Sequence, residues 1–179
     1  KTLVSPPKPS TPEPQATPQP AAASSPAQPA APAAPVGDVS VEVRRGMPGN
    51  AELIANFITN VTGKPVSRMD IMLAFGQKSY LFAEDGQGNH VGGMGWQVEN
   101  LITRTDEIHL KPDFPPEPVV GPLVTAIEEA SMDLQSEVSY IFLSSDASDA
   151  VVHAFEEEGY AVTLVKDIKI PAWREAVQE

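Results

Sequence analysis

The sequence contains no cysteine and only three histidines. Without cysteine, the chain forms no disulfide bond, no thiolate zinc site and no cysteine nucleophile. The histidines, at positions 90, 109 and 153, are too scattered to predict a metal site. No apolar run reaches the roughly 18 residues of a membrane-spanning helix, and no apolar signal segment is present. A cytoplasmic location is therefore expected, although these absences do not fix the compartment.

Positive charge is also scarce, because 12 Lys and Arg stand against 24 Asp and Glu, for a formal net charge of −12. The segment before residue 38 contributes Lys1, Lys8 and Glu13, so the excess of acid lies in the remainder. Such a chain repels nucleic acid and anionic membranes, and neither is expected as a partner. The charge favours a cationic partner and mildly opposes an anionic cofactor, although solubility alone also explains it.

The first 37 residues differ in composition from the rest. Residues 1–36 hold 11 of the 19 prolines, among alanine and serine and almost no large apolar residue. Because such a segment buries too little apolar surface to offset the entropy of ordering, 1–37 is predicted to be a disordered, semi-rigid linker. A PxxP ligand is the alternative interpretation. A linker that begins at a lysine indicates a piece of a longer protein, or a processed one.

Residues 38–170 have the length of one domain, and 171–179 are expected to be a frayed tail. Alternating valines predict a strand at 39–45. An apolar face at helical spacing, capped by Asn50, predicts the first helix. A second helix is expected within 66–76, with four side chains facing inward: Met69, Met72, Leu73 and Phe75.

The sequence from residue 78 to residue 170 predicts five strands and two helices. The strands are expected at 78–84, 90–99, 104–112, 138–145 and 160–170, with a hairpin turn at 85–89. The strand at 138–145 is almost entirely apolar and is expected at the centre of the sheet. The order β-α-α-β-β-β-α-β-α-β predicts an α/β protein with a mixed (α+β) sheet and helices on both faces.

This order and three stretches of sequence resemble the GNAT superfamily of N-acyltransferases. "IHLKPDF" (108–114) is similar to the family's fourth strand and its exit, and "PLVTAIEEA" (122–130) resembles the helix after its pyrophosphate loop. "SDAVVHAFEEEGY" (148–160) resembles its last helix, with Phe155 on the place of a tyrosine. The resemblance spans 39–168. It implies the GNAT-like acyl-CoA N-acyltransferase fold, acetyl-CoA as cofactor, an amine as acceptor, and a homodimer, because family members often dimerise.

The segment that matches the family's pyrophosphate loop departs from the family's pattern. The family uses arginine and glycine there, because glycine lets the backbone approach and free N–H groups at a helix N-terminus bind an anion. The matching residues are Pro115, Pro116, Glu117, Pro118, Val119 and Val120. Proline offers no N–H, and the Glu117 carboxylate would repel a phosphate by about 4 kcal/mol at ~4 Å. The acetyl-CoA loop is therefore predicted to be degenerate.

Pro122 is expected to be the first helical residue, since deeper inside the helix it would break a helical bond, and a weaker anion site is then an alternative. Backbone amides just before and after it would then point outward. With the end of the preceding strand, this gives the candidate cofactor-binding residues Leu110, Val119, Val120, Gly121 and Leu123. The cofactor prediction is accordingly acetyl-CoA or none.

Glu107 and His109 are the candidate catalytic residues. Acyl transfer to an amine needs a base, and strand alternation puts both side chains on one face, as a base and its orienting residue. A solvent-facing polar pair is the alternative. Phe155 cannot protonate a leaving thiolate, as the family's tyrosine is held to do, and is expected in the core. In "HVGGMGW" (90–96), the glycines predict a bulge or a close approach, and Met94 and Trp96 either line the acceptor side or pack in the core.

Two classes of function follow. One is a degenerate, non-catalytic domain that acts as a tethered interaction or ligand-sensing module and has a protein partner. The other is an active acetyl-CoA-dependent N-acetyltransferase with an atypical pyrophosphate loop. The departures at Pro118 and Phe155 favour the first class.

Overall fold

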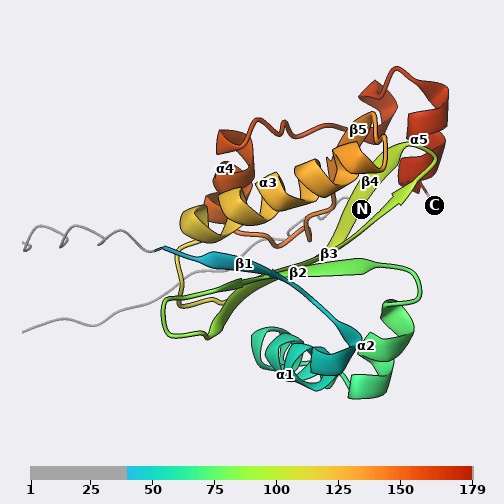
Figure 1. Ribbon diagram of the computed structural model, residues 1–179. Coiled ribbons are helices and arrows are strands. Elements are labelled where there is room, and N and C mark those ends of the chain that lie inside the picture. Colours follow the sequence, from blue (N-terminus) through green and yellow to red (C-terminus); the bar gives the residue numbers. More distant parts are fainter. Residues whose placement is uncertain (1–39, 179) are drawn as a thin grey trace, which may run out of the picture. The chain divides into compact units, whose positions relative to one another are not determined.

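The computed structural model describes residues 40–178, so the predicted linker at 1–37 lies outside the described residues (Figure 1). Five strands form one sheet in the order β1-β2-β3-β4-β5. Neighbours from β1 to β4 pair antiparallel, and β4 pairs parallel with β5. The strands are β1 (Glu42–Arg45), β2 (Ser79–Glu84), β3 (His90–Glu99), β4 (Ile102–Leu110) and β5 (Val138–Ile141). The predicted mixed sheet is confirmed.

Helices cover both faces of this sheet, as predicted. In Figure 1, α1 and α2 lie on one face, and α3 and α4 lie on the other. The helical elements are η1 (Pro48–Asn50), α1 (Ala51–Thr62), α2 (Arg68–Ala74), α3 (Glu117–Asp133), α4 (Asp149–Glu157), η2 (Val165–Asp167) and α5 (Pro171–Gln178). None of the helices within 40–178 is long and apolar enough to cross a membrane.

The alternation of side chains along the strands divides the core into two clusters. Tyr80 and Phe82 of β2 pack against the buried face of α1, which includes Ile54. Met94 and Trp96 of β3 pack on the other side, among residues of α3 and α4. The core interpretation of Met94 and Trp96 is thus the one that the structure supports, since both side chains are buried.

The prediction that α2 turns its methionines inward was wrong. Met69 and Leu73 are 67% and 69% exposed, and Met72 is 38% exposed. The helix has two turns and packs on α1 through Ile71, which is 3% exposed. Residues 69, 72 and 73 share the opposite face of the helix, because positions three and four apart lie together. Phe75 is half-buried and contacts the Tyr80 ring.

The predictions for the end of the domain also need correction. No strand forms at 160–170 in the described chain, where irregular backbone leads into η2. As a result β5 is an edge strand and not the central one that its apolar sequence predicted. The expected frayed tail at 171–178 is helix α5, which Arg104 holds by donating from Nη1 to the Ala176 carbonyl at 2.7 Å.

The glycines of β3 mark close approaches, as predicted. A Cβ on Gly92 would lie 2.3 Å from the Val119 side chain of α3. On the other face, a Cβ on Gly93 would lie 2.5 Å from the Phe82 ring, and one on Gly95 would lie 2.9 Å from the Tyr80 ring. Both helical layers and the aromatic rings of β2 therefore reach the sheet only because β3 lacks side chains at these positions.

We expect Gly93→Ala to lower the free energy of unfolding by about 2 kcal/mol, because the new methyl group overlaps the Phe82 ring in a packed core. Urea denaturation measures the change. Gly49→Ala is the matched control, since a Cβ at Gly49 meets nothing within 4 Å and should change stability by less than about 0.5 kcal/mol. Equal stabilities of the two variants would contradict the packing at Gly93.

Candidate functional site

Strands β4 and β5 separate half-way along β4. Residues Ile102–Thr105 pair with β5, and the last backbone bond is donated by Phe142 to the Thr105 carbonyl at 2.8 Å. The register between β3 and β4 shifts at this point, so that Asp106 is an extra residue in β4. Such a bulge bends a strand and increases its twist. In the described chain, β4 makes no backbone hydrogen bond to β5 beyond Thr105, and its second half presents an open edge.

The bulge places a cluster of charged and polar side chains beside this open edge. The Lys78 ammonium group donates to Asp106 Oδ1 at 2.7 Å and to Glu107 Oε1 at 2.9 Å. The Tyr80 hydroxyl donates to Glu107 Oε2 at 2.8 Å. His109 Nε2 lies 3.8 Å from the same oxygen. The structure therefore brings the candidate residues Glu107 and His109 together, and adds Lys78 and Tyr80 to them.

These contacts keep Glu107 ionised. The His109 imidazole, 3.8 Å away, together with the hydrogen bonds from Lys78 and Tyr80, lowers the pKa of Glu107 to about 2, although burial opposes the shift. Burial and the adjacent Glu107 charge raise the pKa of Tyr80, which stays protonated. A carboxylate of such low pKa is a weak base near neutral pH. The geometry suits Glu107 to orienting the His109 imidazole, and it suits His109 to accepting a proton.

Lys78 and Tyr80 were missed in the sequence, although alternation along 78–84 puts both on one face of β2. Their relation to Glu107 depends on strand register, in which Tyr80 lies opposite Gly95 and Gly95 lies opposite Glu107. Because Gly95 has no side chain, the Tyr80 hydroxyl reaches across β3 to the carboxylate. A sequence without strand register does not reveal this contact.

Helix α3 begins at Glu117, and the prediction that it begins at Pro122 was wrong. Pro116 is the N-cap, and its carbonyl accepts from the N–H groups of Val119 at 3.0 Å and Val120 at 2.8 Å. These two amides are therefore used inside the helix and do not point outward. Because Pro118 has no N–H, the first turn keeps only the Glu117 amide unused by a described backbone partner.

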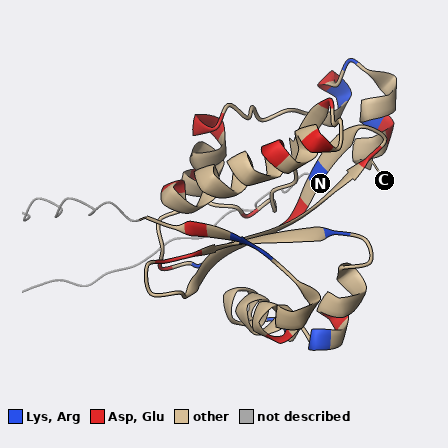
Figure 2. Ribbon diagram, viewed as in Figure 1, with Lys and Arg blue, Asp and Glu red and all other residues tan. Residues whose placement is uncertain are grey.

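The remaining candidate cofactor residues lie in packed surroundings. Gly121 and Leu123 are buried on α3, and Leu110 is half-buried at the end of β4. A Cβ on Gly121 would lie 2.7 Å from Glu158 Oε1, so the Glu158 side chain, just after α4, lies directly against this glycine. Figure 2 marks acidic residues on both α3 and α4, and neither helix contains a lysine or arginine.

The structure places Phe155 in the core, as predicted, with 3% of its surface exposed. Tyr160 packs edge-on against it, and the Tyr160 hydroxyl is hydrogen-bonded to Ser139 Oγ at 2.9 Å and donates to Glu128 Oε1 at 3.1 Å. Burial raises the pKa of Tyr160 to about 12. The hydroxyl nearest to Phe155 in sequence is thus held by these two oxygens, one on β5 and one on α3.

The other two histidines do not join the site. His90 packs against the Phe82 ring, and His153 is exposed beside the acidic side chains of its own helix. Within residues 40–178, no group of three His, Asp or Glu side chains is arranged to hold a metal ion.

We expect the stability that Glu107 contributes to depend on pH. Its pKa of about 2 in the folded chain lies below the ordinary 4.5, so its contribution is complete above about pH 4.5 and is lost as the pH falls towards 2. After discounting for solvent screening, Glu107→Gln should cost about 1–2 kcal/mol at pH 7 and progressively less in acid. Urea denaturation between pH 3 and 7 measures this difference. Glu129→Gln, at an exposed position of α3, is the control, and a cost that is the same at every pH would contradict the assignment.

Comparison with known proteins gives matches among solved structures only. Neither a protein-family profile nor a curated protein matches the chain. A ribosomal-protein-alanine N-acetyltransferase from Brucella melitensis biovar Abortus 2308 is 14% identical with a TM-score of 0.57, over 69% of this chain and 93% of that protein. Aminoglycoside N-acetyltransferase AAC(6')-Iy in complex with CoA is 13% identical with a TM-score of 0.54, over 73% and 93%.

The PaiA N-acetyltransferase of Thermoplasma acidophilum, in complex with coenzyme A, is 11% identical with a TM-score of 0.53, over 67% of this chain and 88% of that one. At identities this low, the likeness establishes the fold and not the activity. The described residues therefore have the GNAT acyl-CoA N-acyltransferase fold, as the order of elements predicted.

Proposed function

We propose that this GNAT-fold domain is a non-catalytic binding module that does not hold acetyl-CoA through the start of α3. The observation that carries the proposal is the first turn of that helix. Three of the four residues from 115 to 118 are prolines, and the amides of Val119 and Val120 already donate to Pro116. A pyrophosphate needs several free N–H groups that point at it, and this turn offers only that of Glu117.

The charge of the turn acts in the same direction. Glu117 is the first residue of α3. Its carboxylate is stabilised by the positive end of the helix dipole, where an external anion would otherwise bind. At ~4 Å and an effective dielectric constant near 20, two unit charges repel by about 4 kcal/mol. That energy corresponds to about three decades in affinity. The residues present thus do not fit the pyrophosphate of acetyl-CoA.

The second support is the absence of an acid at the end of α4. Phe155 is buried and has no proton to give to a leaving thiolate. The neighbouring Tyr160 hydroxyl donates to Glu128 and is hydrogen-bonded to Ser139, so it does not take over this role. Acetyl transfer would have to proceed without either group.

A binding module of this kind acts by recruiting a partner. The domain is strongly acidic, which favours a cationic partner and raises its rate of encounter. The predicted linker outside the described residues would tether the domain and raise its effective concentration near a protein partner or a second copy. Both the protein partner and the homodimer are part of the proposal.

An active N-acetyltransferase is the second candidate function, and one observation favours it. Glu107 and His109 lie beside the open edge of β4, with the carboxylate ionised and in contact with the imidazole. In that case Glu107 would orient His109, and His109 would accept a proton from the amine. The aminoglycoside and PaiA acetyltransferases, which have the same fold, were solved in complex with coenzyme A. Acetyl-CoA is therefore the cofactor of this second candidate function.

Calorimetric titration of the chain with acetyl-CoA and with coenzyme A tests the proposal. We expect no saturable binding up to about millimolar ligand, because the α3 turn lacks amides and has a carboxylate. The double variant Glu117→Arg with Pro118→Gly should gain at least about tenfold in affinity, because it adds one N–H and reverses the charge. Glu129→Arg makes the same change of charge further along α3 and should gain far less. Micromolar binding by the unaltered chain would overturn the proposal.

An acetylation assay with a panel of primary amines separates the two candidate functions. The proposal expects no turnover above the uncatalysed rate, in the unaltered chain or in His109→Gln. If the domain is an enzyme, His109→Gln should lower kcat by about 10²- to 10⁴-fold, because it removes the base, with little change in KM for acetyl-CoA. Turnover that disappears in His109→Gln would therefore establish the second candidate.

A further inference from the structure

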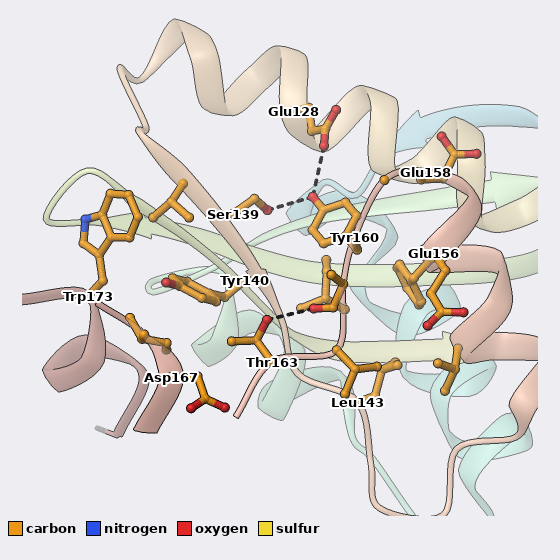
Figure 3. Close-up of a pocket in the computed structure, with 18 of the residues that line it drawn as sticks. Glu128, Ser139, Tyr140, Leu143, Glu156, Glu158, Tyr160, Thr163, Asp167 and Trp173 are labelled. Carbon is orange, nitrogen blue, oxygen red and sulfur yellow. Dashed lines mark hydrogen bonds between the residues drawn. The ribbon is translucent and has the colours of Figure 1, made fainter. Parts of the chain in front are cut away.

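A cavity of about 970 Å³ lies on the outer side of β5, away from the open edge of β4 (Figure 3). Its walls come from β5 and the residue Leu143 beyond it, from α4 and the segment 158–163, and from 167–173, which spans the end of η2 and the start of α5, with Glu128 of α3 at one side. None of its lining residues belongs to β4 or to the first turn of α3. This volume is at the upper end of the range for small-molecule sites, so the cavity is large enough for an organic ligand and is separate from the catalytic candidates.

The cavity exists because no strand covers β5. Residues 160–164 were predicted to continue the sheet, but their backbone makes no hydrogen bond to β5 in the described chain. The contact is made by the Tyr160 side chain instead, whose hydroxyl is hydrogen-bonded to Ser139. Paired strands lie about 4.8 Å apart, and a tyrosine side chain is longer than that spacing. Tyr160 therefore acts as a spacer that keeps the cavity open.

The walls of the cavity are mainly apolar and aromatic. Leu143, Val152 and Phe155 form one part of the wall, and Tyr140 and Trp173 form another. Figure 3 shows Tyr140 and Trp173 towards α5, with Asp167 drawn near them. Aromatic faces attract organic cations, and apolar walls favour an apolar body.

The charged residues that line the cavity favour a positively charged ligand. Four carboxylates line it against one ammonium group: Glu128, Glu156, Glu158 and Asp167 against Lys169. Glu128 accepts from Tyr160, and Glu156 lies 3.9 Å from His153. Asp167 is exposed and makes no ion pair with any residue of 40–178. Glu158 likewise makes no ion pair with any residue of 40–178. Of these two carboxylates, Asp167 is the one that Figure 3 draws on the side of Tyr140 and Trp173.

We propose that this cavity binds an organic cation with an apolar body. The apolar body packs against Leu143, Val152 and Phe155, and the cationic group lies near Asp167, Tyr140 and Trp173. This inference rests on the proposed function as a binding module, and it names the class of ligand. It does not depend on the state of the α3 turn, because that turn does not line the cavity.

Three matched probes test the inference: octyltrimethylammonium, octanol and octanoate, which share a chain length and differ in charge. Titration of the full chain gives the affinity, and tryptophan emission gives the location, since Trp173 lines the cavity and the other tryptophan, Trp96, is buried in the core. We expect octyltrimethylammonium to bind saturably, to change the emission, and to bind at least about tenfold more tightly than octanoate.

Asp167→Asn should weaken binding of octyltrimethylammonium about threefold to tenfold and leave octanol unchanged. Asp133→Asn makes the same change at an exposed position of α3 outside the cavity, and should leave both affinities unchanged. Equal binding of octanoate, equal effects of the two variants, or no binding of any probe to a chain that circular dichroism shows to be folded would each overturn the inference.

The same probes keep the inference apart from the proposed function. A quaternary nitrogen has no proton to lose and cannot be acetylated, so its binding reports on the cavity alone. If acetyl-CoA binds tightly while octyltrimethylammonium behaves as expected, the proposed loss of cofactor binding fails and the cation site stands. If neither binds, the cation site fails and the non-catalytic proposal stands.

Discussion

The bulge at Asp106 is the constraint on which the rest of the candidate site depends. By adding one residue to β4, it ends the pairing with β5 at Thr105 and turns Glu107 towards the side chains of β2. Lys78 joins the two acidic residues at the bulge and offsets their repulsion. The open edge and the ionised carboxylate beside it thus have one structural origin.

The start of α3 is set by a second constraint, the lack of a side chain at Gly92. Gly92 lets the start of α3 lie directly on β3, because a Cβ there would lie 2.3 Å from the Val119 side chain. The proline-rich turn is thereby fixed against the sheet through Val119, whose side chain is buried. A turn held in this way has little freedom to rearrange and expose other amides to an anion.

Most of the fold followed from periodicity, because the hairpins and the helix crossovers leave strong local patterns. The failures concern information that lies outside a local pattern. Met69, Met72 and Leu73 have helical spacing, but spacing alone does not tell which face meets α1. The segment 160–170 has the composition of a strand, but Tyr160 anchors it through its side chain. For the site, alternation placed Glu107 with His109, whereas Lys78 and Tyr80 required the register of three strands.

The exposed face of α2 affects how the domain responds to oxidation of its methionines. The chain has five methionines, of which Met94 is buried. The other four are 38–67% exposed: Met47, Met69, Met72 and Met132. Oxidation of a methionine converts an apolar thioether into a polar sulfoxide, which disrupts a core but costs little in solvent. Met69 and Met72 lie on the exposed face of α2, which is anchored by Ile71 on its other face. Their oxidation therefore leaves the packing intact, and the chain has no cysteine thiol to oxidise.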